Sequence, residues 1–219
     1  MPHTWNDPTR AERVYNPRVV SDPTTPPRYL EPYLAAVREH GGTFRSLLWS
    51  SPETQSARFR AITDLVDFTG KTVLDAGCGR ADFLDHLQSL GWQGGNYIGL
   101  EAVPVLAAVA QRKMPHGHRV VEGDFIQHPE LMRIDAGIIV FCGSLNTLDR
   151  FSFYLTLRHA IEAAPAVVFN FLSSAHRAGG PHLTWHDPQD VIKFTRGMGG
   201  RVRLADKYLK GDCLIHVER

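Results

Sequence analysis

The chain has 219 residues, of which 43% are hydrophobic and 21% are charged, and its net charge is +1 with histidines neutral. This composition predicts a globular protein with a sizeable core and excludes wholesale disorder. The near-neutral charge argues against a protein that coats DNA or RNA. The longest apolar runs, such as Ile138–Cys142, are far too short to cross a bilayer. We therefore expect no DNA partner and no membrane partner.

The N-terminal segment and the cysteines both indicate a cellular location. The first ten residues have no apolar core, so we expect no secretory signal. The three cysteines, Cys78, Cys142 and Cys213, are far apart and show neither a CxxC motif nor paired zinc spacing. These features indicate a reduced, cytoplasmic protein with no structural disulfide and no metal site.

The first 69 residues differ from the rest. Residues 1–28 contain six prolines and little apolar periodicity, which fits either an extended arm or a disordered tail. The pattern predicts a helix over Glu31–His40, ended by Gly41 and Gly42, and a second helix that begins at Ser51-Pro52. We expect residues 1–69 to form an N-terminal arm and helical cap, and residues 70–219 to form the main domain.

From residue 70 onward, strand and helix patterns alternate. Apolar runs predict parallel strands at Thr72–Ala76, Tyr97–Glu101, Arg119–Glu122, Ala136–Phe141 and Ala166–Phe171. Helices are predicted between and after them at Ala81–Leu90, Val103–Lys113, Arg150–Ala164 and Pro188–Met198. Two final strands, Arg201–Leu209 and Asp212–Glu218, are separated by Lys210-Gly211, which predicts an antiparallel hairpin with a short turn.

The loop after the first strand carries a ligand-binding pattern. Gly77 and Gly79 allow a tight turn between a buried strand and a helix, where doubly wound folds hold nucleotide-like ligands. Glu101, 22 residues after Gly79, ends the next strand and can accept both ribose hydroxyl protons. Asp75 and Asp82 flank the loop and would repel a pyrophosphate. This pattern favours a ribose-bearing ligand with a cationic end, such as S-adenosylmethionine.

Here the sequence resembles the class I S-adenosylmethionine-dependent methyltransferases. Three segments carry the likeness: Leu74–Gly79, Ile98–Glu101 and Glu122–Phe125. Two departures are Ala81, where the family usually has a third glycine, and Glu101, where aspartate is commoner. The segment Trp49–Gln55, with Arg58 and Phe59 after it, is also similar to small bacterial methyltransferases of undefined substrate.

The resemblance implies a Rossmann-like, doubly wound seven-stranded sheet of order 3-2-1-4-5-7-6. Strand 7 would be antiparallel, with helices on both faces and an N-terminal helical cap. It also implies S-adenosylmethionine as cofactor and S-adenosylhomocysteine as product. The residues expected to bind the cofactor are Asp75, Gly77, Cys78, Gly79, Glu101, Ala102, Gly123, Asp124, Phe125, Phe141 and Cys142.

Two segments offer groups for the methyl acceptor. Ser144 and Asn146 follow the fourth strand and would orient the acceptor, or instead cap the loop before the next helix. Cys142 fits a nucleophile or, better, a small buried apolar residue. The loop lacks the Asn/Asp-Pro-Pro-Tyr/Phe motif of many amino-group methyltransferases, which argues against DNA adenine as the substrate.

The loop Ser173–His186 holds three histidines and a tryptophan at the expected binding edge. His176, His182 and His186 are candidate general bases, because an imidazole titrates near neutrality, and Trp185 would cover an apolar acceptor. Alternatively, the histidines face solvent and Asp187 caps the following helix.

The helical cap supplies two more candidates for substrate binding. Trp49 would help to close the pocket, and Arg58 would bind an acceptor carboxylate in a bidentate manner. The alternative is an amphipathic helix packed on the sheet with Arg58 in solvent.

Taken together, these features favour a small-molecule methyltransferase that works mainly by in-line positioning of the acceptor. Alternatives are a nicotinamide oxidoreductase, a non-catalytic S-adenosylmethionine-binding regulatory protein, and an RNA or protein methyltransferase. A homodimer is compatible with the sequence.

Overall fold

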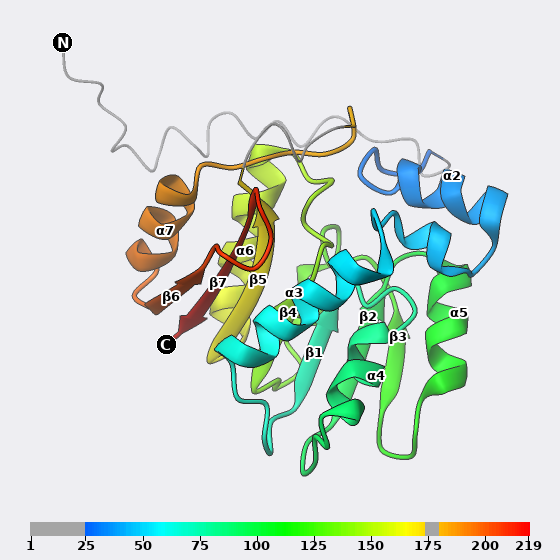
Figure 1. Cartoon of the computed structure of the whole chain (residues 1–219), viewed down its shortest axis with the longest axis horizontal. Helices are drawn as coiled ribbons and strands as arrows, with labels where there is room; N and C mark the ends of the chain where they lie inside the picture. Colours follow the sequence, from blue (N-terminus) through cyan, green and yellow to red (C-terminus); the bar gives the residue numbers. More distant parts are fainter. Residues whose placement is uncertain (1–24, 174–179) are drawn as a thin grey trace.

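The computed structural model describes residues 25–173 and 180–219 and shows a seven-stranded sheet of order β3-β2-β1-β4-β5-β7-β6 (Figure 1). The strands are β1 (Val73–Ala76), β2 (Tyr97–Glu101), β3 (Arg119–Glu122), β4 (Ile138–Phe141), β5 (Ala166–Leu172), β6 (Arg201–Ala205) and β7 (Asp212–Glu218). The first five strands pair in parallel, and β7 pairs antiparallel with both β5 and β6. The predicted order and the antiparallel seventh strand are confirmed.

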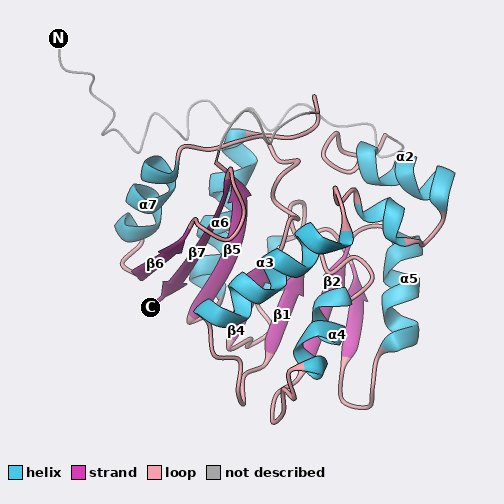
Figure 2. Ribbon diagram, viewed as in Figure 1, coloured by secondary structure: helices cyan, strands magenta, loops and turns pink. Residues whose placement is uncertain are grey.

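Helices cover both faces of this sheet (Figure 2). They are α2 (Glu31–His40), α3 (Pro52–Leu65), α4 (Asp82–Ser89), α5 (Pro104–Lys113), α6 (Arg150–Ala163) and α7 (Pro188–Gly197), with short 3-10 turns η1 (Phe44–Leu47) and η2 (Pro129–Met132). No helix in the described ranges is long and apolar enough to cross a membrane.

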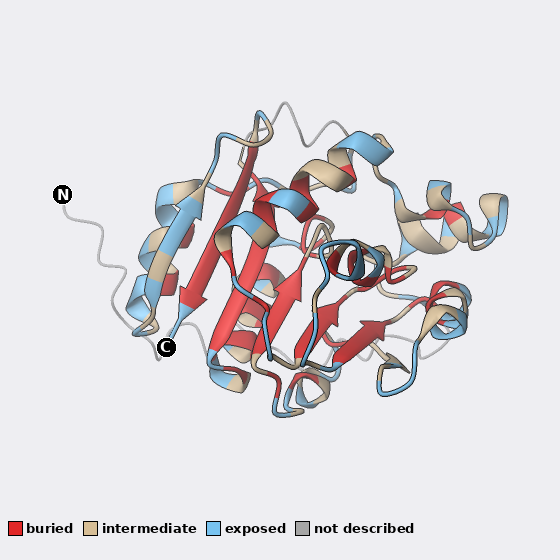
Figure 3. Ribbon diagram, turned by 60° about the horizontal axis from the view of Figure 1, so that its bottom comes forward, coloured by how far each residue is buried: buried red, intermediate tan, exposed pale blue. Residues whose placement is uncertain are grey.

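The buried side chains of each inner strand divide between two cores, as strand alternation requires. In β4, Ile138 and Val140 face α3 and α4, whereas Ile139 and Phe141 face α6. Figure 3 shows the resulting band of buried strands, flanked by the exposed edge strand β6. Apolar residues on both faces explain why these strands read as continuous hydrophobic runs.

The N-terminal helices begin and end where local sequence signals predict. Ser51 caps α3 by accepting from the backbone N–H of Thr54, and the Thr54 hydroxyl accepts from the backbone N–H of Ser51 in return. Helix α2 ends at Gly41, whose φ of 62° lies in the left-handed region. In Figure 1, α2 lies beyond the end of the sheet where β1 and β2 finish.

The terminal hairpin differs from the prediction in one respect. The connection is longer than the short turn expected at Lys210-Gly211, because β6 ends at Ala205. Tyr208 instead folds back, and its hydroxyl donates to the carboxylate of Asp212 at the start of β7. The strand therefore ends before its predicted range does, and a side-chain hydrogen bond lies within the connection.

The sheet order sets the position of the binding site. β1 has β2 on one side and β4 on the other, so the chain winds outward in both directions from this point. The loops that leave the carboxyl ends of β1 and β4 therefore separate, and open α/β sheets bind ligands in such a crevice.

Candidate active site

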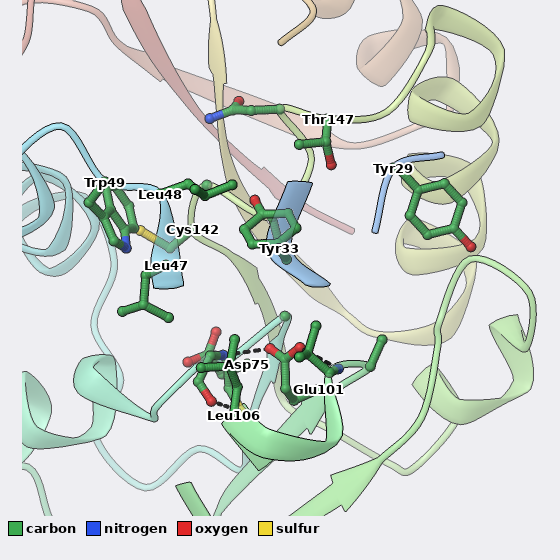
Figure 4. A pocket seen from close by; sticks show the side chains of 18 of the residues that line it. Tyr29, Tyr33, Leu47, Leu48, Trp49, Asp75, Glu101, Leu106, Cys142 and Thr147 are labelled. Atoms are coloured by element: carbon green, nitrogen blue, oxygen red, sulfur yellow. Dashed lines mark hydrogen bonds between the residues drawn. The ribbon is translucent and has the colours of Figure 1, made fainter. Parts of the chain in front are cut away.

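A cavity lies at this switch point (Figure 4). Its wall combines the loops after β1, β2, β3 and β4 with α2, the segment before α3, and Leu183. In the view of Figure 4, Asp75 and Glu101 lie on one side, and Trp49, Tyr33 and Thr147 lie on the other. The cavity thus lies between the main domain and the N-terminal helices.

The loop after β1 brings the backbone close to the cavity. Gly77 has a φ of 79° and Gly79 a φ of 56°, conformations that side chains rarely adopt. A Cβ at position 77 would lie 2.4 Å from the Cβ of Ser144, so the loops after β1 and β4 touch here. Ala81 adopts a φ of 58° without being glycine, a conformation that L residues with a Cβ rarely hold.

Glu101 is fixed at the end of β2 by the backbone around it. Its Oε2 accepts from the N–H of Gly79 at 2.7 Å, and its Oε1 accepts from the N–H of Val103 at 2.8 Å. Burial raises the pKa of the carboxyl, whereas these backbone donors lower it. The carboxylate is therefore held in one orientation on the cavity wall and keeps lone pairs for a ligand.

Asp75 lies deeper, at the end of β1. It is buried, and its Oδ2 accepts from the hydroxyl of Tyr97 at 2.6 Å. Burial raises the pKa of Asp75 to about 7, although the tyrosine hydrogen bond opposes this shift. This carboxyl therefore titrates near neutrality next to the glycine loop.

The loop after β3 contributes Asp124, whose carboxylate already accepts from several hydrogen-bond donors. Its Oδ2 accepts from the hydroxyl of Tyr29 at 2.7 Å, and its Oδ1 accepts from the N–H of Ile126 at 2.9 Å. Phe125 lines the cavity beside it. Tyr29 thus ties the segment before α2 to this corner of the site.

Acidic groups dominate the charge of the cavity wall. Its described carboxylates are Asp75, Asp82, Glu101 and Asp124. Asp82 is paired with Lys113, at 2.8 Å. Arg58 is the one cationic side chain on the described wall.

Arg58 is neither solvated nor free to form the bidentate contact expected from the sequence. It is 7% exposed, and both Nε, at 2.8 Å, and Nη2 donate to Oδ2 of the buried Asp212. Asp212 also accepts from Asn170 and Tyr208, and its pairing raises the pKa of Arg58 against the effect of burial. The guanidinium edge that would grip an acceptor carboxylate therefore already holds Asp212.

Trp49 stacks on this ion pair and lies against the loop after β4. The guanidinium carbon of Arg58 is 4.8 Å from the centre of its ring. A Cβ on Gly143 would approach the indole to 3.1 Å, and the N–H of Gly143 donates to Asn170 at 2.7 Å. Trp49 thus lies on the cavity wall, as predicted, and contacts Arg58 of α3 and Gly143 of the loop after β4.

The loop after β4 contributes three candidates to the same side. Ser144 and Asn146 line the cavity, but the Ser144 hydroxyl already donates to the carbonyl of Ala76 at 2.6 Å. Cys142 also lines it, and burial raises the pKa of its thiol well above the ordinary value. A thiolate nucleophile at neutral pH is therefore disfavoured.

The structure brings neither described histidine candidate to the cavity. His182 is exposed, and His186 is 2% exposed and stacks on Phe153 at 3.8 Å between ring centroids. Burial lowers the pKa of His186 to about 4, so it stays neutral at physiological pH. Asp187 caps α7 by accepting from the N–H of Gln189, which fits the alternative interpretation of this segment. His176 lies outside the described residues.

Three other predicted site residues lie away from the described cavity wall. Phe141 is fully buried and packs on Phe125 with ring centroids 5.5 Å apart, because strand alternation turns it into the α6 core. Gly123 packs against Leu131. Trp185 is 48% exposed. The other predicted residues all line the cavity: Asp75, Gly77, Cys78, Gly79, Glu101, Ala102, Asp124, Phe125, Cys142, Trp49, Arg58, Ser144 and Asn146.

Sequence reasoning missed the contribution of α2 to the site. Tyr33 lines the cavity, and burial raises its pKa to about 12, while Tyr29 bonds to Asp124. Tyr33 lies on α2, whereas Tyr29 lies in the turn just before it. The four-residue spacing of the two tyrosines can be seen in the sequence, but residues of a helix's apolar face have the same spacing, so it does not by itself indicate a binding site. Thr147 and Leu183 were also missed.

Comparison with known proteins identifies the fold. No family model matches the chain, and no curated protein matches it significantly. Solved structures match it well. One is a SAM-dependent methyltransferase from Archaeoglobus fulgidus, with a TM-score of 0.61, 17% identity, and coverage of 77% of this chain and 95% of that chain. The chain has the fold of the S-adenosylmethionine-dependent methyltransferases.

Two further structures support this fold. DhpI in complex with SAH has a TM-score of 0.66 at 14% identity and covers 87% of this chain and 95% of its own. Magnesium protoporphyrin IX methyltransferase from Synechocystis with bound SAM has a TM-score of 0.59 at 13% identity, with coverage of 88% and 89%. Within the described part of this methyltransferase fold, no three His, Cys, Asp or Glu residues cluster as a metal site would require.

Proposed function

We propose that this protein binds S-adenosylmethionine and transfers its methyl group to a small-molecule acceptor, with S-adenosylhomocysteine as the product. The fold is that of methyltransferases, and the neighbours include proteins crystallised with SAM and SAH. When bound, the cofactor supplies an electrophilic methyl group on a sulfonium. We infer the rest of the function from the side chains of the cavity.

The residues on the cavity wall fit this cofactor. Glu101 would accept the ribose hydroxyls, since its carboxylate is fixed by two backbone donors and faces the cavity. Asp124 and Phe125 would hold the adenine by its amino group and its ring. Gly77 and Gly79 would let the ligand approach the backbone, because both hold left-handed φ angles that side chains rarely adopt. The carboxyl of Asp75 would face the cationic end of the ligand.

The charge of the wall is the observation that carries the proposal. Four carboxyl groups line the described wall, of which Asp82 is paired with Lys113, and the one guanidinium on that wall is already paired with Asp212. A pyrophosphate would meet repulsion from these carboxylates, whereas an ammonium and a sulfonium would be attracted. The cavity therefore suits S-adenosylmethionine better than a nicotinamide dinucleotide.

The acceptor side suggests catalysis by positioning. Neither described histidine of the Ser173–His186 loop lines the cavity, and the thiol of Cys142 has a raised pKa. We therefore propose that the chain holds the acceptor in line with the methyl group and excludes water, which alone supplies much of a rate enhancement. Trp49, Tyr33 and Asn146 would do the holding.

The N-terminal segment belongs to this function. Tyr29, Tyr33, Trp49 and Arg58 come from residues before position 70 and line the cavity. We propose that the described part of residues 1–69 acts as a cap and that residues 70–219 bind the cofactor; most of the predicted arm, residues 1–24, lies outside the described residues. The three cysteines are free thiols, which suits a cytoplasmic location.

A labelling experiment tests the proposal. The protein and methyl-labelled S-adenosylmethionine are incubated together with one fraction of a cell extract at a time: small molecules, RNA or protein. We expect label in the small-molecule fraction, and much less with the Glu101→Ala variant. Label in the RNA or protein fraction would leave methyl transfer intact but contradict the acceptor class. Binding of the cofactor without transfer to any fraction would favour a regulatory protein.

A further inference from the structure

The acceptor side of the cavity has a chemistry of its own. Its wall is formed by Tyr33, Trp49, Cys142, Asn146, Thr147 and Leu183, which come from four separate segments. In Figure 4, Trp49, Tyr33 and Thr147 lie across the cavity from Asp75 and Glu101. None of these wall residues carries a charge at neutral pH. An acceptor bound here would therefore meet rings, aliphatic carbon and neutral polar groups.

Arg58 does not change this balance. Asp212 has no exposed side-chain surface and receives four hydrogen-bond donors: Nε and Nη2 of Arg58, Nδ2 of Asn170 and the hydroxyl of Tyr208. The guanidinium beside the cavity is thus compensated by a carboxylate directly behind it. A second carboxylate, on an acceptor, would lose its hydration without gaining an uncompensated cation.

Asn146 has unmet hydrogen-bonding capacity on this side. It is 8% exposed, and its Oδ1 is buried without a hydrogen-bond partner. The backbone around it is fixed, since its N–H donates to Gly143 at 3.3 Å and its carbonyl accepts from Thr184 at 2.8 Å. Ser144, by contrast, is satisfied by Ala76.

An amide turned about its last bond presents either its oxygen or its nitrogen to the same point. A ligand group that both donates and accepts would satisfy Asn146 in either orientation. Hydroxyl groups and aromatic amines are such groups, and neither carries a charge at neutral pH. The aromatic rings of Trp49 and Tyr33 suit the apolar remainder of such a molecule.

We infer that the methyl acceptor is an uncharged, largely apolar molecule that presents a hydroxyl or an aromatic amine to Asn146. This inference rests on the proposed function, because it takes the side of the cavity opposite Glu101 as the acceptor side. It replaces the carboxylate-bearing acceptor that Arg58 suggested in the sequence.

Three probes of similar size test the inference. Phenol, anisole and benzoate are each titrated into the protein saturated with S-adenosylhomocysteine, and binding is followed by calorimetry at neutral pH. Phenol should bind about tenfold more tightly than anisole, which lacks the donor. It should also bind at least about tenfold more tightly than benzoate, which must bury a charge. Tighter binding of benzoate, equal binding of phenol and anisole, or no binding of phenol would overturn the inference.

Two variants assign the effect to its residues. Asn146→Leu keeps the side-chain size and should remove the phenol–anisole difference without changing the affinity for S-adenosylhomocysteine. A phenol preference that survives this change would contradict the role of Asn146. Asp212→Asn should strengthen benzoate binding, because the charge of Arg58 would no longer be compensated; unchanged benzoate binding in the folded variant would contradict that part of the argument.

The same titrations separate this inference from the proposed function. Affinity for S-adenosylhomocysteine is measured first, and each probe is also titrated without it. Failure of S-adenosylhomocysteine to bind would contradict the proposed function, whereas the preference among the three probes would still report the chemistry of the wall. Normal S-adenosylhomocysteine binding with a preference for benzoate would contradict the inference alone.

Discussion

The two halves of the cavity are built in different ways. The cofactor half, around Glu101 and the glycine loop, is acidic and is fixed by backbone N–H groups next to the strand ends. The acceptor half is neutral and is fixed by side chains from distant segments, centred on the Arg58–Asp212 pair. The two partners of that pair are 154 residues apart in the chain.

This difference separates what the fold provides from what the individual sequence adds. Backbone donors at strand ends arise in any chain that adopts this sheet. A side-chain network can change with a few substitutions while the sheet stays the same. We therefore expect the cofactor half to define the reaction and the acceptor half to define the substrate.

The largest expected effect is a loss of folding stability on changing Asp212, where the acceptor half meets the core. Asp212→Ala would leave Arg58 buried without its partner, since the two side chains are 0% and 9% exposed. Removing one member of a buried pair costs about 3–5 kcal/mol. Urea unfolding of the variant should show this loss in the free energy of unfolding.

An exposed pair provides the matched control. Arg150 and Asp190 are 2.8 Å apart, but their side chains are 66% and 52% exposed. Asp190→Ala should therefore reduce the free energy of unfolding by less than about 1 kcal/mol. Similar losses in the two variants would mean that the Arg58–Asp212 network does not hold the acceptor half together.

His186, a buried histidine outside both halves, should make stability depend on pH. The pKa of His186 is lowered to about 4 by burial, with Arg150 as a further cause, so the unfolded chain binds a proton more readily. Its contribution to stability is therefore complete above about pH 6.5 and is lost as the pH falls toward 4.

His186→Phe should remove about 2–3 kcal/mol of this pH dependence, measured by urea unfolding between pH 7 and pH 4. The same change at the exposed His182 should leave the dependence as it is in the native protein. If His186→Phe instead abolished turnover with an unchanged pH profile of stability, the structural role would be wrong and the catalytic hypothesis would return.

In the cofactor half, Glu101→Ala should weaken binding of S-adenosylmethionine by about 1–3 kcal/mol, because the ribose hydroxyls would lose a charged acceptor. Asn146→Leu, in the acceptor half, should leave this affinity unchanged. Calorimetry of the two variants tests the division directly. Equal losses would show that the two halves do not act separately.

The smallest expected effect is the pH dependence of ligand affinity that Asp75 should cause. Burial raises its pKa to about 7, so the group is mostly protonated at pH 6 and mostly ionised at pH 8. A cationic ligand prefers the carboxylate, and its affinity should therefore rise with pH by up to about tenfold over this range. Asp75→Asn should bind more weakly and show no such rise. An affinity that falls with pH in the native protein would exclude Asp75 as a partner of the cation.

The same contrast explains which features the sequence could predict. The strands, their order and the glycine loop follow from local patterns and from the family likeness, and Glu101 follows from its spacing to Gly79. The partner of Arg58 does not follow, because no local pattern links Arg58 to Asp212 at the start of β7. The prediction of His186 as a candidate base failed for a related reason. The sequence places it in a loop, but its ring stacks on Phe153 of α6 and is buried in the core.

We propose that the acidic half of the cavity selects a cationic, phosphate-free nucleoside. Parallel calorimetric titrations of the native protein with S-adenosylmethionine and with NADH test it most directly. We predict saturable binding of S-adenosylmethionine that depends on Glu101, and no measurable binding of NADH. Tight binding of NADH that is lost in Glu101→Ala, with no binding of S-adenosylmethionine, would contradict the account.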